Sequence, residues 1–465
     1  MKIKDLIKQD AGFQYVVDNM EFMSSAGRRK MLNAEFLTDS SALLGEWERL
    51  ERAILAVKEF KYKKPYIELR HCLMQLHDLQ GTLANLANHT TLNEVELFEI
   101  KSLAQLSQNA SGAIAQMGLS DILPLPATKE VFDLLDPDRT GIANFYIYDT
   151  YDQRLTPLRR ELQALQITGE EAVRISELLA LQNEIQLEVC TRLSDQLTRW
   201  TDMLVTTMEQ MAYTDFLIAS AELAIQWNLT RPEIGDHIEY KGLINPRLKE
   251  RNEKAKLRYQ PVDITLHQGV TLITGANMAG KTVLLKSVGT AQIMAQCGMY
   301  VPASMAVIRL VDGIATSIGD DQDEMNGLSS YAAEIIKISD ILATFRQSDT
   351  LVLIDEPART TNPVEGKALV QAINKILSAQ GSTTLVTTHY SGLGHGSFRR
   401  LRVKGFVENM ADVPLNPQNI NRFIDYSLTE DNSDDVPHEA LRIASILGCD
   451  SRMIDLAKDS INNQK

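Results

Sequence analysis

The chain has 465 residues, of which 44% are hydrophobic and 23% charged, and a formal net charge of −14; such a composition is typical of a globular protein with two or three domains. It contains no apolar run of the roughly 18 residues that a membrane span needs, and its first residues lack a signal-peptide core, so we expect a cytoplasmic protein without a membrane partner. The four cysteines are scattered without metal-binding spacing, which favours reduced thiols, and the acidity disfavours a nucleic-acid coat while permitting a local basic surface.

The first half of the chain is predicted to be helical. Residues 1–20 are an N-terminal segment, and residues 21–235 show helical apolar spacing with few breakers. The clearest stretches are 43–58, 94–117, 155–167 and 171–227, the last long enough to cross a domain or form a lever. A turn at Asp136–Gly141 precedes the aromatic run Phe145–Tyr148, which is a short strand or a loop.

The pattern changes at about residue 236, where short apolar runs alternate with helical stretches. This alternation predicts an α/β domain over residues 236–428 with its ligand at the carboxyl ends of parallel strands. The expected strands are 270–274, 350–354 and 383–387, and the expected helices are 283–297, 330–346 and 364–379. Residues 429–465 form a tail that begins with an acidic linker, formed by Glu430, Asp431, Asp434 and Asp435, and continues as helices. The predicted fold class is therefore α plus α/β.

A glycine-rich loop between the strand at 270–274 and the next helix has the spacing GxxxxGK[ST]. Its backbone N–H groups and the following helix N-terminus can surround phosphates, so a nucleoside triphosphate is expected here. Lys281 would neutralise the β- and γ-phosphates, and the Thr282 hydroxyl would ligate Mg²⁺. The expected nucleotide-binding residues are Gly275, Ala276, Asn277, Met278, Ala279, Gly280, Lys281, Thr282 and Val283.

The apolar strand Leu351–Ile354 delivers two carboxylates, Asp355 and Glu356, to the same edge of the sheet. Asp355 is the predicted Mg²⁺ ligand, and Glu356 is predicted to polarise the attacking water. Alone, an Asp-Glu pair often marks an ordinary strand end, but its position about 80 residues after the phosphate loop favours catalysis. His389 ends the next strand, where it could sense the γ-phosphate; an ordinary surface or core histidine is the alternative.

The segment Gly319–Tyr331 is rich in Gly, Asn and Ser and suits a loop entering a helix N-terminus, an anion-binding geometry. Its four carboxylates would repel phosphate within a single site, unless the loop meets a second subunit's nucleotide through Ser329 and Ser330. An exposed acidic loop is the alternative. Two basic clusters, Lys58–Lys64 and Arg399–Lys404, are either solvated faces or phosphate contacts.

These motifs resemble the MutS family of ATPases. GANMAGKT, the loop ending LSSYAAE, IDEPARTTNPVEG and TTHY stand in that family's order and spacing. Residues from Ser25 to Arg52 are similar to the start of the MutS core or lever domain, Asp215 to Ile234 to its end, and His438 to Ile461 to the helical dimerisation tail. The resemblance covers residues 21–461 and implies an ABC-type P-loop NTPase domain following a helical lever domain.

The chain also departs from the mismatch-repair enzymes. It begins at the core domain, so we expect no mismatch-reading or connector domain, and the core of about 210 residues looks short for a full DNA clamp. Gly327–Ser330 reads GLSS where repair enzymes carry Gly-Arg-Ser-Thr. The motifs look more like the MutS branch with an Smr nuclease tail, without that tail. Pro357–Thr361 replaces the usual Gly-rich run after the Asp-Glu pair.

The resemblance also implies roles for single residues. Lys281, Glu356 and His389 would serve hydrolysis, while Thr282 and Asp355 would hold Mg²⁺. Ser329 would contact the γ-phosphate bound by the partner subunit, and Tyr259 would stack on adenine. The composite site implies a homodimer, or a heterodimer with a related MutS-like chain.

Three cellular roles remain open from the sequence. The first is an ATPase acting on DNA in mismatch repair or recombination, with salt-dependent backbone contacts. The second is ATP-driven remodelling of a protein or ribosome-like partner, for example a reactivating factor in a metabolic operon, since the lever is present while the DNA-reading parts are not. The third is a nucleotide-dependent scaffold with negligible turnover.

Overall fold

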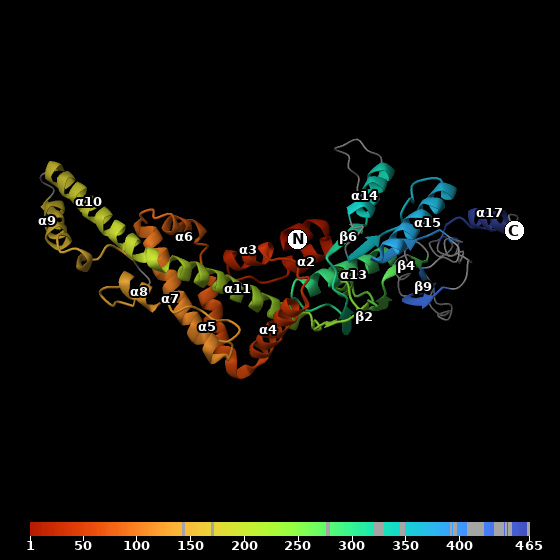
Figure 1. The fold of residues 1–465 in the computed structure, drawn as a ribbon, viewed down its shortest axis with the longest axis horizontal. Coiled ribbons are helices and arrows are strands. Elements are labelled where there is room, and N and C mark those ends of the chain that lie inside the picture. Colours follow the sequence, from red (N-terminus) through yellow and green to blue (C-terminus); the bar gives the residue numbers. More distant parts are fainter. Residues whose placement is uncertain are drawn as a thin grey trace. The chain divides into compact units, whose positions relative to one another are not determined.

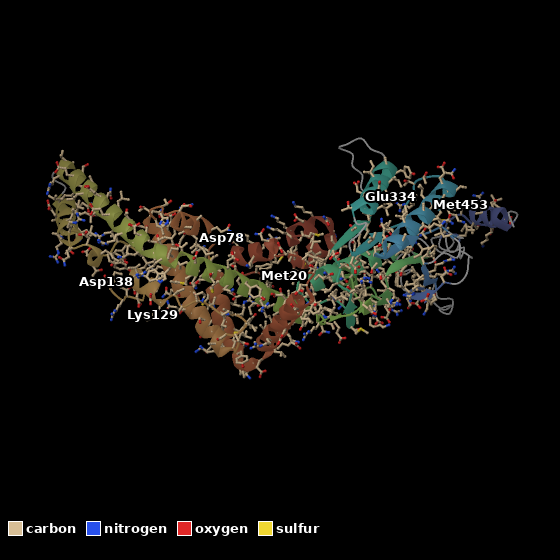
Figure 2. All side chains as sticks on the ribbon, in the orientation of Figure 1. Met20, Asp78, Lys129, Asp138, Glu334 and Met453 are labelled. Atoms are coloured by element: carbon tan, nitrogen blue, oxygen red, sulfur yellow. The ribbon has the colours of Figure 1, made fainter. Side chains whose placement is uncertain are left out.

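The computed structural model describes residues 1–141, 145–168, 172–275, 280–319, 330–344, 349–390, 393, 398–406, 423–431, 441, 444 and 449–462. The chain divides into two compact units (Figure 1). An α/β unit contains residues 1–20, 34–48 and 223–465, and a helical unit contains residues 21–33 and 49–222. The side chains of both are drawn in Figure 2. Among the described helices, none is long and apolar enough to cross a membrane.

The helical unit confirms the helices expected in the first half of the chain. Two of its helices, α4 and α11, cross the unit boundary. The elements are α3 (Ser25–Asn33), α4 (Ser40–Lys58), η1 (Phe60–Tyr62), α5 (Lys63–Met74), α6 (Gln80–Ala87), α7 (Glu94–Gln116), α8 (Lys129–Leu135), η2 (Asp149–Tyr151), α9 (Leu155–Thr168), α10 (Ala172–Leu197), η3 (Thr198–Trp200) and α11 (Thr201–Gln226). Residues 145–148 form a loop, not a strand.

The prediction of a single helix over residues 171–227 was wrong in one respect, because the 3₁₀ turn η3 separates α10 from α11. Hydroxyl groups around the break donate to carbonyls of the preceding turn: Ser194 to Cys190 at 2.7 Å, Thr198 to Ser194 at 3.1 Å and Thr201 to Thr198 at 2.8 Å. Such bonds compete with the helical ladder and favour a local change of winding. The lever-length stretch is therefore two helices joined by one 3₁₀ turn.

The two ends of the predicted core domain meet inside the helical unit. The carboxylate of Asp215 on α11 accepts hydrogen bonds from the backbone N–H of Met23 (3.0 Å) and of Ser24 (2.8 Å), and from the Ser24 hydroxyl (2.6 Å). A Cβ atom at Gly27 would lie 2.2 Å from an Asp215 oxygen. Only glycine fits there, so Asp215 fastens the start of α3 to α11 by close approach as well as by hydrogen bonds.

The α/β unit contains the strands and helices expected after residue 236. Its elements are α1 (Ile3–Gln9), α2 (Ala11–Asp18), β1 (Glu233–Ile234), β2 (Ile238–Leu243), α12 (Pro246–Lys254), β3 (Val262–Leu266), β4 (Gly269–Thr274), α13 (Lys281–Gln296), β5 (Met305–Ile308), β6 (Gly313–Ser317), α14 (Ser330–Thr344), β7 (Thr350–Ile354), α15 (Pro363–Gln380), β8 (Thr383–Thr388), β9 (Arg399–Phe406), β10 (Ile424–Glu430) and α17 (Ser451–Asn462).

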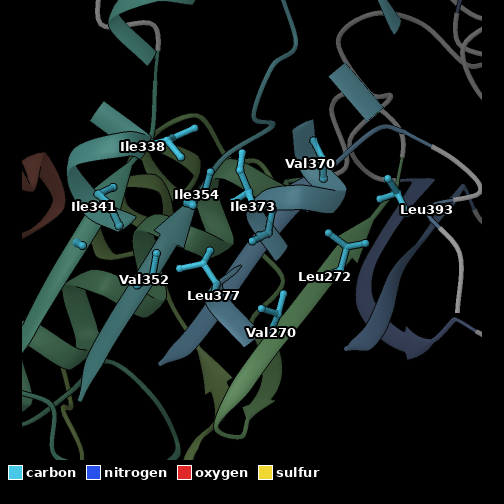
Figure 3. Close-up of a cluster of buried hydrophobic side chains, with 12 residues drawn as sticks. Val270, Leu272, Ile338, Ile341, Val352, Ile354, Val370, Ile373, Leu377 and Leu393 are labelled. Atoms are coloured by element: carbon cyan, nitrogen blue, oxygen red, sulfur yellow. The ribbon is translucent and has the colours of Figure 1, made fainter. Parts of the chain in front are cut away.

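A six-stranded sheet of order β10-β9-β4-β8-β7-β6 forms the centre of this unit. All neighbouring pairs are parallel except β10 with β9. Figure 3 shows the core on one face, where buried side chains of the strands pack against those of α14 and α15. A smaller sheet of order β1-β5-β2-β3 accompanies it.

The N-terminal segment packs against the helix that follows the phosphate loop. Asp10 caps α2 by accepting from the Phe13 N–H at 2.7 Å, and it accepts from the Thr290 hydroxyl on α13 at 3.0 Å. A Cβ atom at Gly12 would lie 2.3 Å from that hydroxyl oxygen. The boundaries expected from sequence, at residues 20 and 235, separate this segment from the α/β domain, whereas the structure groups it with that domain.

Candidate functional site

The site is built where three parallel strands of the large sheet end together. Thr274 of β4 pairs with Thr388 of β8, and Val386 of β8 pairs with Ile354 of β7. Strand β8 thus lies between the strand that leads to the phosphate loop and the strand that carries the two carboxylates. Side chains that follow these strands must therefore lie at one edge of the sheet.

The described ends of the phosphate loop adopt conformations that favour glycine. Gly275 has φ of 149° and Gly280 has φ of 77°, which L side chains rarely adopt. Gly280 is the N-cap of α13, so the loop leads directly into the N-terminus of this helix, a geometry that favours anions. The residues between them, 276–279, include the predicted contacts Ala276, Asn277, Met278 and Ala279 and lie outside the described residues.

Lys281 is almost fully buried and lies against the loop. Its Nζ donates to the Gly275 carbonyl at 2.7 Å and lies 3.0 Å from Oε1 of Glu356. A buried ammonium requires such partners, because its charge is costly away from water. The same ammonium could pair with a phosphate group bound in the loop. The phosphate would then replace the Glu356 carboxylate as its counter-ion and would carry more negative charge.

Thr282 and Asp355 come together although 73 residues separate them in the chain. The Thr282 hydroxyl donates to Oδ2 of Asp355 at 2.7 Å, and the Thr387 hydroxyl donates to Oδ1 at 2.6 Å. The Asp355 N–H donates to the Ser317 carbonyl at 2.9 Å. A hydroxyl beside an oriented carboxylate matches the oxygen donors that Mg²⁺ takes alongside phosphates and waters, so these residues fit the predicted metal role.

Glu356 lies at the centre of the charged groups. Its N–H donates to the Thr387 side chain at 3.0 Å, and its φ of 44° is a left-handed value that costs energy in a residue other than glycine. Its carboxylate faces three cationic or ionisable groups: Lys281, Arg359 at 3.8 Å and His389 Nδ1 at 3.9 Å. The turn thus directs this carboxylate into the phosphate region.

Burial lowers the pKa of His389 below its ordinary value of 6.5. The charge of Glu356 acts in the opposite direction, and the charges of Lys281 and Arg359 add to the lowering. The imidazole is therefore neutral at pH 7. A neutral ring can donate or accept a hydrogen bond at a phosphate oxygen or at the attacking water.

A cavity of about 220 Å³ opens beside the phosphate loop. Tyr259, Val283 and Tyr426 line it together with Gly280 and Ser287. Burial raises the pKa of Tyr259, whose hydroxyl accepts from the Asn245 N–H at 2.7 Å, so the phenol is un-ionised and held in place. The predicted residues Tyr259 and Val283 thus share one cavity with the end of the loop.

Sequence reasoning missed two residues near the site. Tyr426 comes from β10, and the nearest atom of its ring would lie 3.0 Å from a Cβ atom at Gly280. Asp431, expected in an acidic linker, is buried instead: it accepts from the Thr274 hydroxyl at 2.9 Å and pairs with Arg402 at 3.1 Å. Both residues are far from the phosphate loop in the chain, so no sequence motif near the loop could have identified them.

The structure describes the second basic cluster, Arg399–Lys404, but not the predicted trans contact. Arg400 and Arg402 pair with Asp431, and Arg399 pairs with Glu430, so these members of the second basic cluster already have carboxylate partners. The predicted trans contact, Ser329, lies outside the described residues, while Ser330 begins α14.

The fold defines a mixed class, with one helical unit and one α/β unit in which charged residues gather at the carboxyl ends of parallel strands. Comparison with known proteins then names the family. Residues 271–464 match the family described as MutS domain V. This part of the chain is thus similar to domain V of the MutS family.

Individual relatives agree with this assignment. The chain is 30% identical over 244 residues to the "DNA mismatch repair protein MutS" of Thermus aquaticus, covering 52% of the chain and 29% of that protein. It is 34% identical over 238 residues to the "Endonuclease MutS2" of Thermus thermophilus, covering 51% and 29%. An "Endonuclease MutS2" of Carboxydothermus hydrogenoformans is 29% identical over 397 residues, covering 84% and 47%. The chain thus spans less than half the length of these relatives.

Proposed function

We propose that this chain is an ATPase that binds Mg²⁺ and ATP at the edge of the six-stranded sheet. The hydrogen bond between Thr282 and Asp355 carries the proposal, because it joins the phosphate-loop helix to the carboxylate strand as a metal–phosphate site requires. Mg²⁺ held by these two residues would neutralise charge on the β- and γ-phosphates. The phosphates would accept hydrogen bonds from the N–H groups of residues 275–282 and would pair with the ammonium of Lys281.

Glu356, His389 and Lys281 are the proposed catalytic residues. In the structure Glu356 is the counter-ion of Lys281. A bound triphosphate would replace it in that role, which leaves the carboxylate able to orient a water and accept its proton. Neutral His389 would hydrogen-bond the γ-phosphate or that water without adding positive charge. Lys281 would stabilise the charge that develops on the transferred phosphate.

We propose that the adenine base binds in the cavity beside Gly280. The ring of Tyr259 and the apolar surface of Val283 offer the flat and apolar contacts that a base requires. Tyr426 closes the same cavity from β10. The backbone at Gly280 joins the cavity to the phosphate region.

The proposed assembly is a dimer, formed by two copies or with a related MutS-like chain. Ser329 is the residue proposed to reach the partner subunit's γ-phosphate. Hydrolysis would then release the closed dimer and move the helical unit, which is how nucleotide sites drive larger changes in many enzymes.

DNA is the proposed target, and an exposed basic turn between α4 and α5 supports it. Lys58, Lys61, Lys63 and Lys64 flank Phe60 in the sequence, and Phe60 is 83% exposed. The Nζ atom of Lys63 lies 5.9 Å from the Phe60 ring centroid. Lysines beside an exposed ring suit phosphates and the faces of unpaired bases. We call residues 58–64 the basic turn.

Measurements of ATP binding and phosphate release on the same variants test the ATPase. Lys281→Ala should lose nucleotide binding, because its buried ammonium is the proposed counter-charge of the phosphates, and Glu356→Gln should bind but not hydrolyse. Lys286→Ala, an exposed lysine of the same helix, is the matched control and should behave as wild type. Equal nucleotide affinity in Lys281→Ala and Lys286→Ala would contradict the assignment.

A further inference from the structure

The turn after Glu356 contains a second residue in an unfavourable conformation. Ala358 is fully buried and has φ of 60°, in the left-handed region that residues with a Cβ rarely adopt. Such a conformation persists only when surrounding contacts impose it. The question is which groups hold this turn, because its conformation sets the direction of the Glu356 side chain.

Two side chains hold the backbone of Ala358 from opposite sides. Oε1 of Glu334, on α14, accepts a hydrogen bond from the Ala358 N–H at 3.1 Å. The hydroxyl of Tyr390, which follows β8, donates to the Ala358 carbonyl at 2.8 Å. Figure 2 labels Glu334 on its helix. The peptide groups on both sides of this strained residue are therefore fixed by partners from two other elements.

The contact between Tyr390 and Ala358 leaves no space for a side chain at residue 366. A Cβ atom at Gly366 on α15 would lie 2.2 Å from the Tyr390 hydroxyl oxygen and 3.0 Å from the Ala358 carbonyl oxygen. The hydroxyl reaches the turn only because residue 366 is glycine. Burial and then the charge of Glu334 raise the pKa of Tyr390, so the phenol keeps its proton and remains a donor.

Glu356 itself is fixed at its other side. Its N–H donates to Thr387, so the catalytic carboxylate stands between one anchor on β8 and a second anchor at Ala358. Loss of the second anchor would let the turn relax towards ordinary dihedral angles. The Glu356 side chain would then point away from the phosphate region, while Lys281 and Thr282 would stay in place.

We propose that Glu334 is a positioning residue for Glu356, acting through the hydrogen bond to the Ala358 N–H. This inference rests on the proposed ATPase function. Helix α14 would thus help to hold the Glu356 carboxylate in place through the turn at Ala358. The carbonyl oxygen of a glutamine can accept the same bond, so the acceptor matters and the charge of Glu334 does not.

The test compares kcat, KM and nucleotide affinity among Glu334→Ala, Glu334→Gln and Asp340→Ala. Glu334→Ala should lower kcat by about 10- to 100-fold, the loss expected from a misplaced catalytic group, with nucleotide affinity within about twofold of wild type. Glu334→Gln should retain most of the wild-type kcat. Asp340→Ala removes an exposed carboxylate from the same helix and should match wild type.

Three results would overturn the inference. The first is a wild-type kcat in Glu334→Ala. The second is an equal loss in the Ala and Gln variants, because that would make charge, not the hydrogen bond, responsible. The third is loss of affinity with kcat preserved. Where Glu334→Ala fails to fold, Tyr390→Phe supplies the test from the other side of Ala358, with kcat again expected to fall and affinity to stay. A wild-type chain without turnover contradicts the ATPase itself, and the inference falls with it.

Discussion

At the scale of single residues, Lys281 and Asp355 both have partners within the chain. Lys281 has the Gly275 carbonyl and the Glu356 carboxylate, and Asp355 accepts from two hydroxyls. These contacts make burial of the charges tolerable. In the proposed mechanism, a bound phosphate would replace Glu356 as the partner of Lys281. Nucleotide binding would thereby free the Glu356 carboxylate for catalysis.

The pH dependence of turnover should report His389. Because burial lowers its pKa below 6.5, the imidazole stays neutral as the pH falls to that value and is protonated only further below it. We expect kcat at saturating ATP to be flat from pH 8 to 6.5 and to decline below, as a cation forms beside Lys281. A pH–rate profile measures this. His389→Asn should have lower activity at pH 7.5 and a weaker acid limb; a wild-type decline that begins above pH 6.5 would contradict the assignment.

The position of the proposed site residues was predictable, because the GxxxxGK[ST] spacing and the strand that ends in Asp-Glu place them at one edge of a parallel sheet. Lys281, Thr282, Asp355, Glu356 and His389 all lie at the predicted edge of the sheet. Their mutual contacts were not predictable, and neither were Tyr426, Asp431 and the Glu334 contact. These come from distant segments, and no local pattern marks a residue that acts only through the folded chain.

At the scale of elements, local pattern predicted the long helices and the buried strands well. The runs at 270–274, 350–354 and 383–387 consist of Val, Leu, Ile and Thr and are almost entirely buried, because both faces of the large sheet are covered. The smaller sheet was not predicted: β1 has only two residues and β5 four, and the strands β2 and β3 are only partly buried. The break at η3 was also missed, because it depends on hydroxyl hydrogen bonds within an otherwise helical pattern.

The start of α3 should depend on Asp215. Asp215→Ala removes three hydrogen bonds to a carboxylate, and hydrogen bonds to charged groups stabilise by about 1.5–3 kcal/mol each before compensation. We expect a local loss of about 2–3 kcal/mol, measured as faster amide hydrogen exchange at Met23 and Ser24. Asp195→Ala, an exposed carboxylate of α10, is the control. Unchanged exchange at both amides in Asp215→Ala would refute the anchoring role.

At the scale of the whole molecule, the chain folds into two units that do not follow its order. Residues 1–20 and 34–48 join the α/β unit because they pack against segments more than 200 residues away, for example Trp47 donating to the Ala295 carbonyl at 3.2 Å. Sequence spacing carries no information about such contacts. The predicted boundary near residue 235 therefore reflects composition, whereas the structural units reflect packing.

DNA binding should depend on the basic turn. Replacing Lys58, Lys61 and Lys63 by Ala should weaken binding and reduce the slope of log K against log salt concentration by about 0.7–0.9 for each phosphate that is no longer neutralised. Fluorescence anisotropy with duplex and single-stranded DNA over a salt series measures both quantities. The control replaces the solvent-accessible lysines 129, 249 and 254, which changes the net charge equally. An equal effect of both triple variants, or no wild-type binding at low salt, would count against DNA as the target.

The most direct test of the proposed function is the rate of phosphate release at saturating Mg²⁺ and ATP, compared between wild type and Glu356→Gln. Removal of a general base typically costs 10²- to 10⁴-fold, so we expect a rate lower by about that factor. Nucleotide affinity should be preserved, because Lys281, Thr282 and the loop N–H groups remain. Equal rates of phosphate release in wild type and Glu356→Gln would contradict hydrolysis at this site.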